Sequence, residues 1–192
     1  MNFKFMGRMV LIFSFALAGC HTIHPVAQPD SALLKSISPK SAKIGLVLDS
    51  VYRDYKSKDR GDMFADPQTY LIGQALVPLT TAYFEKAFQS VSVYETLPNK
   101  LELHGEGYVI RPRIREFDNE LIGFSEQEIS VTLAAEIYDQ NMNLMKEVKA
   151  HAYEEGKLGF FNSSKDSGLI VSRGLQKALL AVIKEIEKVL TP

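Results

Sequence analysis

Cysteine is almost absent from this sequence, which has a single one, Cys20, and tryptophan is missing altogether. One thiol excludes a disulfide within the chain and excludes metal sites built from several cysteines. Charge of one sign is not in excess either, because 22 lysine and arginine residues stand against 23 acidic residues. A nucleic-acid-binding protein usually shows a basic excess, so this balance argues against that class.

The sequence also lacks an apolar run of the about 20 residues that a transmembrane helix needs. The run Met9–Leu17 is much shorter, follows the basic residues Lys4 and Arg8, and leads into the small residues before Cys20. A charged start, a short apolar stretch and small residues before the cut are the features of a secretory signal. We therefore predict a signal peptide over residues 1–19, cleaved between Gly19 and Cys20.

The motif Leu17-Ala18-Gly19-Cys20 resembles the lipobox of bacterial lipoproteins, in which the signal peptidase cuts before the cysteine. The resemblance implies that Cys20 carries a covalent diacylglycerol and an N-acyl chain, and we expect no other cofactor. Two or more acyl chains hold a protein firmly on a membrane, because each buried CH₂ contributes about 0.8 kcal/mol. An Asp after the cysteine usually retains such proteins in the inner membrane. Here His21 follows, so we expect the outer membrane, periplasmic side. An ordinary secretory signal with an incidental cysteine and a buried helix are the alternatives.

Removing residues 1–19 leaves 173 residues and lowers the formal net charge from −1 to −3. This length suits one domain with a tether. Residues 20–40 contain several prolines and serines and read as the lipidated tether. Its apolar residues Leu33, Leu34 and Ile37 can dock on the domain, which we expect to span residues 41–192.

The first half of the domain shows a strand, a loop and a helix. The apolar run Lys43–Val51 predicts a buried strand, and the charged stretch Tyr52–Asp66 predicts a long loop. Asp66-Pro67 suits the N-cap and first position of a helix. Apolar residues recur at helical spacing over Leu71–Phe88, and the stripe continues in phase through Pro78, so we expect one kinked helix.

The second half contains the strands of a predicted antiparallel meander. After a short strand at residues 91–95, the segments 107–117, 126–139 and 144–154 alternate between apolar and polar residues. Pro112 cannot donate to a ladder, so the first segment is an edge strand or is bulged there. The residues of the middle segment that we expect to face the core are Ile129, Val131, Leu133, Ala135 and Ile137.

A final helix runs from Ser163 or Ser164 to about Leu190, with one apolar face and one charged face. Two helices with an apolar stripe each can bury it on one face of a sheet. We therefore predict a single two-layer domain of the α+β or α/β class. It has about five mostly antiparallel strands with two long helices on one face.

No catalytic motif is recognisable: there is no Gly-rich phosphate loop, nucleophile elbow, zinc-protease helix or calcium loop. His151 lies on the outward face of a strand near Glu147 and Tyr153. Surface pairing explains it as well as a general base does. We therefore expect no enzyme and no metal site.

Two features rise above this background. Arg111, Arg113 and Arg115 share the outward face of one strand. We favour ion pairs with Glu126, Glu128 and Glu136 of the next strand, and the alternative is docking of an acidic partner or a lipid phosphate. The second feature is the pair Phe160 and Phe161 after Gly159. These side chains either fold back on the sheet edge or insert into a partner or the membrane.

The layout of tether, sheet and two helices resembles small envelope lipoproteins of Gram-negative bacteria. These include auxiliary lipoproteins of ABC transport systems, lipoprotein activators of penicillin-binding proteins, and export-accessory lipoproteins. The lipobox at Cys20 is the only shared motif. The resemblance implies a non-catalytic assembly or accessory role that involves another envelope protein, and it leaves room for a homo-oligomer. The alternative is a lipid or small-ligand carrier that uses the space between the kinked helix and the sheet.

Overall fold

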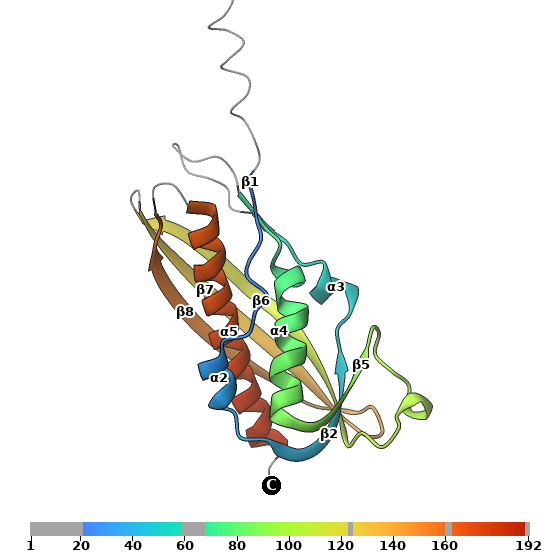
Figure 1. The fold of residues 1–192 in the computed structure, drawn as a ribbon. Helices are drawn as coiled ribbons and strands as arrows, with labels where there is room; N and C mark the ends of the chain where they lie inside the picture. The colour runs from blue at the N-terminus through green and yellow to red at the C-terminus, as the bar shows by residue number, and fades with distance from the viewer. Residues whose placement is uncertain (1–20, 59–67, 123–124, 160–162, 191–192) are drawn as a thin grey trace, which may run out of the picture.

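The computed structural model describes residues 21–58, 68–122, 125–159 and 163–190. Five strands form the main sheet in the order β5-β2-β6-β7-β8 (Figure 1). Their bounds are Phe88–Tyr94 for β5, Lys40–Val47 for β2, Tyr108–Ile122 for β6, Glu126–Asp139 for β7 and Leu144–Lys157 for β8. β2 runs parallel to β5 and β6, whereas β6, β7 and β8 form the predicted antiparallel meander. The sheet is therefore mixed, and the α+β prediction is confirmed.

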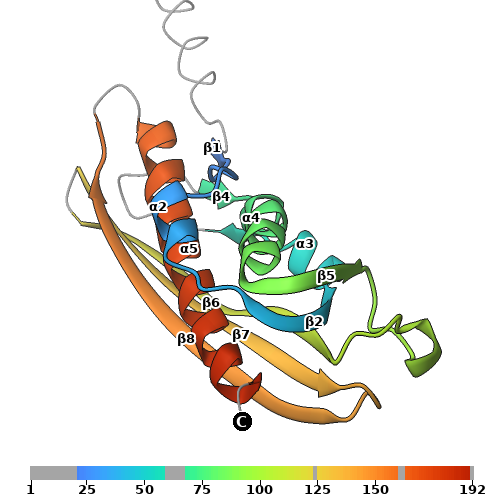
Figure 2. The same ribbon diagram turned by 60° about the horizontal axis from the view of Figure 1, so that its bottom comes forward.

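Two long helices, α4 (Ile72–Ala87) and α5 (Ser163–Leu190), cover the same face of this sheet. Figure 2 shows both helices on the concave side, while none of the described helices lies over the opposite side of β6, β7 and β8. The shorter elements are α2 (Ser31–Lys35), α3 (Ser50–Arg53) and the 3₁₀ turn η1 (Lys100–Glu102). None of the described helices is long and apolar enough to cross a membrane.

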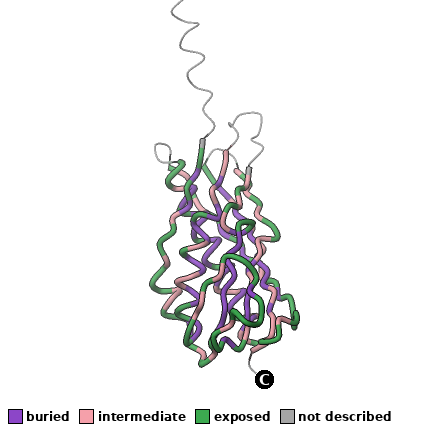
Figure 3. The backbone as a smooth tube through the Cα atoms, turned by 90° about the vertical axis from the view of Figure 1, so that its right-hand side faces the viewer, coloured by how far each residue is buried: buried purple, intermediate pink, exposed green. Residues whose placement is uncertain are grey.

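The buried residues gather in the interior of the molecule, as the burial colours show (Figure 3). Leu76, Leu79, Tyr83 and Phe84 of α4 have no exposed surface. The five residues of β7 that the alternation assigns to the core are all buried. Buried apolar surface stabilises the fold by about 25 cal/mol per Å².

The strand predicted over residues 43–51 ends earlier in the structure. β2 stops at Val47, and α3 begins at Ser50. Asp49 is the N-cap of α3, because its side chain accepts a hydrogen bond from the Tyr52 N–H at 3.1 Å. The apolar residues alone predict a strand as far as Val51, but the N-cap Asp49 starts a helix there and the strand ends before it.

The long helix also begins later than its sequence signals predict. Gln68–Tyr70 forms β4, which pairs with β1 (His21–Ile23) and β3 (Ser57–Lys58) in a small second sheet. α4 then starts at Ile72 without a side-chain cap. Asp66-Pro67 lies outside the described residues. Strand pairing with distant segments overrode the local helix signal.

Pro78 and Pro112 occupy the positions that their chemistry predicts. α4 is one helix with Pro78 inside it. Pro112 lies in β6 beyond Ile110, the last residue of that strand paired with β2. From Pro112 to the bulge between Ile114 and Glu116, β6 therefore has a strand partner on one side only among the described residues.

Candidate functional site

The predicted arginines lie on the side of β6–β8 that no helix covers, which we call the open sheet face. Arg111 donates to Asp49 Oδ2 from Nε at 2.9 Å and from Nη2 at 2.6 Å. Arg113 donates to the same oxygen from Nη1 at 2.9 Å. Because β2 runs beside the start of β6, Asp49, two residues beyond the end of β2, reaches both guanidinium groups.

The remaining partners come from the meander. Glu136, which is directly opposite Arg111 on β7, lies 3.6 Å from Arg111 Nη1 and 3.8 Å from Arg113 Nε. Arg115 follows the two others into the bulge and pairs with Glu147 of β8 at 2.7 Å. Three arginines thus meet three carboxylates, and Lys149 Nζ also lies 3.8 Å from Glu147 Oε1.

The arginines form ion pairs, as the favoured prediction has it, but two of their three carboxylate partners differ from the predicted ones. Of the acids expected to pair with the arginines, only Glu136 does so among the described residues. Asp49 and Glu147 take the other places, and Asp49 has no signal in the sequence beyond its position after an apolar strand. A role of the three arginines in partner binding stays a prediction.

The electrostatics of Asp49 follow from its position. Burial by itself would raise the pKa of this carboxyl. The hydrogen bond from Arg111, the hydrogen bond from the Tyr52 N–H and the charges of Arg113 and Arg111 outweigh that effect. The pKa of Asp49 therefore lies below its ordinary value, and the group is ionised near neutral pH.

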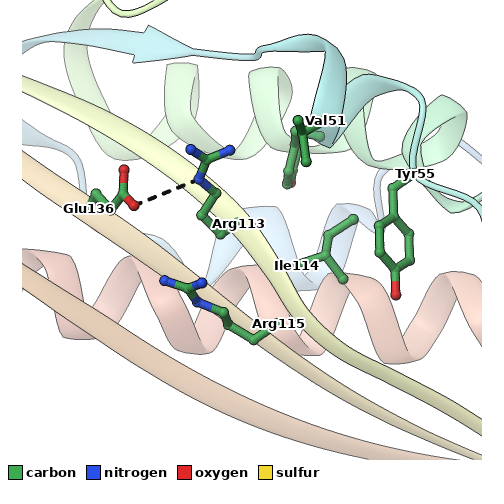
Figure 4. A pocket seen from close by; sticks show the side chains of 7 residues that line it. Val51, Tyr55, Arg113, Ile114, Arg115 and Glu136 are labelled. Carbon is green, nitrogen blue, oxygen red and sulfur yellow. Dashed lines mark ion pairs between the residues drawn. The ribbon is translucent and has the colours of Figure 1, made fainter.

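A surface cavity of about 290 Å³ opens beside this cluster (Figure 4). Its walls combine apolar and charged side chains: Val51, Tyr52, Tyr55, Arg113, Ile114, Arg115 and Glu136. Tyr52 is fully buried, and its hydroxyl is 2.6 Å from Thr80 Oγ1 of α4. Both guanidinium groups in its wall already pair with carboxylates, Arg113 with Asp49 and Arg115 with Glu147.

The open sheet face also carries a group of carboxylates that the sequence does not predict. Glu120, Glu128 and Glu155 lie directly opposite one another on β6, β7 and β8, and we call them the carboxylate row. Asp118 and Glu116 extend it along β6. Within the described ranges, none of the three row residues forms an ion pair. Like charges directly opposite each other on adjacent strands are destabilising.

The negative charges of this row affect the pKa of Tyr153 on β8. Tyr153 lies two residues before Glu155 on the same strand, opposite Ser130. Its hydrogen bond to Glu128 raises the pKa of Tyr153 to about 12, and the charges of Glu128 and Glu155 act in the same direction. Sequence reasoning assigned Glu128 to an arginine, whereas the register places it among carboxylates.

The histidines show no catalytic arrangement. His151 Nδ1 is 3.2 Å from Thr132 Oγ1 on the exposed sheet surface. The His104 backbone N–H donates to Glu106 Oε2. In the part of the chain that the structure describes, no group of three or more His, Cys, Asp or Glu is placed to hold a metal ion.

The other predicted site residues lie outside the described ranges. These are Gly19 and Cys20 of the lipidation motif and the pair Phe160 and Phe161. Their roles stay predictions.

No protein-family model matches the sequence, and no curated protein matches it. The fold is similar to that of protein XCC0632 from Xanthomonas campestris, described with the family name DUF330. The two chains are 12% identical, the match covers 87% of this chain and 92% of that one, and the TM-score is 0.52. The hypothetical protein CT253 from Chlamydia trachomatis is 10% identical, with 79% and 99% of the two chains covered and a TM-score of 0.51.

A minor lipoprotein from Acinetobacter baumannii is also similar, at 13% identity over 78% of this chain and 95% of that one. Its TM-score of 0.45 is too low to support an argument. The likeness to the first two proteins shows a shared fold. That fold is one that bacterial proteins from two different genera use.

Proposed function

We propose that this chain is a lipid-anchored protein of the bacterial outer membrane, facing the periplasm, that acts as a non-catalytic accessory or assembly factor. In this proposal it binds another envelope protein through the open sheet face. The observation that carries the proposal is the carboxylate row Glu120–Glu128–Glu155 on the open sheet face, over which none of the described helices lies.

The row is hard to explain as scaffold alone. Carboxylates directly opposite each other reduce stability by about 0.2–1 kcal/mol per pair. Glu136 and Glu147 are also opposite each other, but three arginines neutralise that part of the sheet. The row has no such arginine among the described residues. A feature that weakens the isolated fold is favourable when a partner supplies the opposite charge.

The chemistry of the partner follows from this charge. A segment rich in lysine or arginine on another envelope protein would neutralise the row and pair with several carboxylates at once. The cavity beside Arg113, farther along the same sheet face, would receive a polar side chain from the same partner. Such a surface adds specificity and speeds encounter through charge complementarity.

The alternative of a lipid or small-ligand carrier finds less support. Its cargo would lie between α4 and the sheet, where Leu76, Leu79, Tyr83 and Phe84 are fully buried. These four side chains belong to the buried core, and protein interiors are close-packed.

Photocrosslinking in intact cells tests the docking surface. A photoreactive residue at Ser130, beside the row, is expected to trap a specific partner, whereas the same residue at Lys184 on α5 is not. The charge reversal Glu128→Lys should abolish the adduct. The matched reversal Glu85→Lys, on the exposed side of α4, should leave it unchanged.

Two results would contradict this proposal: equal adducts at Ser130 and Lys184, or an adduct that Glu128→Lys leaves intact. The anchor has its own test. Labelled palmitate is expected to enter the wild-type protein and to be absent from Cys20→Ala. Equal labelling of both proteins would refute lipidation at Cys20.

A further inference from the structure

Residues 21–37, which the sequence assigns to a tether, are bound to the domain. β1 pairs in parallel with β4, so that Thr22 lies beside Thr69. The Leu71 N–H donates to the Ile23 carbonyl at 3.1 Å. Ile23 is only 1% exposed, and Pro25 is buried as well. The chain is therefore held from the first described residue onward.

The next residues run along α5. Ser172 Oγ donates to the Val26 carbonyl at 2.6 Å. Gln176 binds the segment twice, because its Oε1 accepts from the Asp30 N–H at 2.6 Å and its Nε2 donates to the Gln28 carbonyl at 3.4 Å. Gln176 Oε1 also accepts from the Tyr83 hydroxyl at 2.9 Å, which ties the contact to α4.

Close approach of backbones completes the attachment. A Cβ atom on Gly168 of α5 would lie 2.8 Å from the His24 carbonyl oxygen, closer than real Cβ contacts. Only glycine lets the segment lie so near the helix. Further along, Asp30 caps α2 with two backbone hydrogen bonds, and Ile37 is buried in the core. We call residues 21–37 the strap.

The strap determines how far the domain can move from residue 20. A free tether of 17 residues would reach about 60 Å when fully extended. Because the strap begins at His21, no free residue separates Cys20 from the β1–β4–β3 sheet. The strap thus removes nearly all of that reach.

We propose that the strap fixes the orientation of the domain on the bilayer, with the β1–β4–β3 end against the lipid headgroups. The inference rests on the lipid anchor at Cys20 that forms part of the proposed function. α5 starts at this end and runs to the opposite one (Figure 1). At 1.5 Å per residue its 28 residues place its C-terminal end about 40 Å from the membrane.

This orientation has a consequence for the partner. The open sheet face stands roughly upright on the membrane, and the carboxylate row lies in the half of the meander nearer to it. A partner must therefore bring its basic segment to a surface close to the lipid, not to one at the end of a long tether.

Quenching by nitroxide-labelled headgroups tests the orientation on the full-length lipidated protein in phospholipid vesicles. Acylated Cys20 leaves no free thiol, so one added cysteine carries the only fluorophore. We compare Thr69→Cys, on β4, with Lys184→Cys, near the far end of α5. Quenching several-fold stronger at position 69 than at position 184 is expected, and equal quenching would overturn the proposal.

Lengthening the chain provides a variant that leaves every strap contact in place. Ten glycine and serine residues inserted between Cys20 and His21 add a flexible span of about 17 Å. Quenching at position 69 should then fall toward the value at position 184. The same insertion in the turn after Gln140 should leave it unchanged. Unaltered quenching after the first insertion would refute the strap as the orienting device.

Opening the strap itself gives an independent measurement. In the double variant Ser172→Ala and Gln176→Ala, the backbone amides of residues 23–30 should exchange hydrogen several-fold faster, and quenching at position 69 should drop. Ser90→Ala, on the exposed β5, is the matched control. Slow exchange in the double variant would contradict the strap. A protein that does not float with vesicles would refute the anchor and this inference together, whereas failure of crosslinking at Ser130 would affect only the partner.

Discussion

Arg111 donates two hydrogen bonds to one carboxylate oxygen of Asp49, a residue 62 positions earlier in the chain. The pair joins the end of β2 to β6 at the place where the parallel pairing of these strands stops. Both side chains are largely buried, with 25% and 11% of their surfaces exposed. Removal of one partner therefore leaves the other charge poorly solvated.

The variant Asp49→Asn separates the charge of this residue from its capping role. Asparagine still accepts the hydrogen bond from Tyr52 N–H, so α3 keeps its cap. We expect a loss of about 2 kcal/mol in the free energy of unfolding, measured by urea denaturation, because two guanidinium groups lose their main acceptor. Asp54→Asn, at an exposed carboxyl nearby, should change it little. A loss no larger than that control would show that the pair adds nothing.

The same carboxyl makes stability depend on pH in a defined direction. The pKa of Asp49 is lower in the folded protein than its ordinary value near 3.9, so the folded state binds the proton less readily than the unfolded state. Its contribution is fully present above the unfolded pKa and is lost as pH falls through the folded pKa. The stability difference between wild type and Asp49→Asn should therefore hold from about pH 5 to 7 and shrink below about pH 4. A difference that grows with acidification would have the wrong sign.

The carboxylate row predicts a substitution that stabilises the isolated protein. Glu128→Gln removes the central charge and keeps an acceptor for the Tyr153 hydroxyl. Urea denaturation at low salt should show a gain of about 0.5 kcal/mol that shrinks as salt screens the row. Glu136→Gln is the matched substitution on the same strand and should destabilise, since Glu136 lies between Arg111 and Arg113. If Glu128→Gln and Glu136→Gln both destabilise the protein, repulsion within the row does not weaken the fold.

Gly73, near the start of α4, is expected not to tolerate a larger residue. A Cβ atom on Gly73 would lie 2.1 Å from the Arg53 carbonyl oxygen at the end of α3. Gly73→Ala must push the two helices apart, so we expect a loss of about 1–3 kcal/mol in thermal or urea unfolding. At Gly107 the nearest atom to an added Cβ is the Lys43 carbonyl oxygen at 3.9 Å, and alanine should be accepted there. Equal effects at both glycines would contradict the contact.

Much of the fold could be predicted because its signals are local. The alternation along 126–139 assigns Ile129 and Ile137 to the core, and both are buried. The helical stripe of α5 and the in-phase passage of α4 through Pro78 are equally visible in the residues themselves. The spacing of apolar residues along a strand or helix determines which side chains share a face. The buried face can therefore be predicted without knowing which distant segments pack against it.

The site was less accessible from the residues alone. The outward arginines of β6 were identifiable, but Asp49 reaches them only because β2 lies parallel beside β6. Glu128 reads as a partner for an arginine until the register places Glu120 and Glu155 opposite it. A shift of one residue in that register would change every such pairing.

The sequence by itself determined the lipidation motif at Cys20 as a prediction, the number of main strands, the antiparallel meander and the two amphipathic helices. Each depends on residue type and spacing within one segment. Only the tertiary structure decided that Asp49 joins the arginines, that three glutamates form a row, and that the segment after Cys20 is a strap on α5. Outside the meander, these contacts join residues dozens to more than a hundred positions apart. They form only when distant strands and helices pack together, and the local residue pattern does not encode that packing.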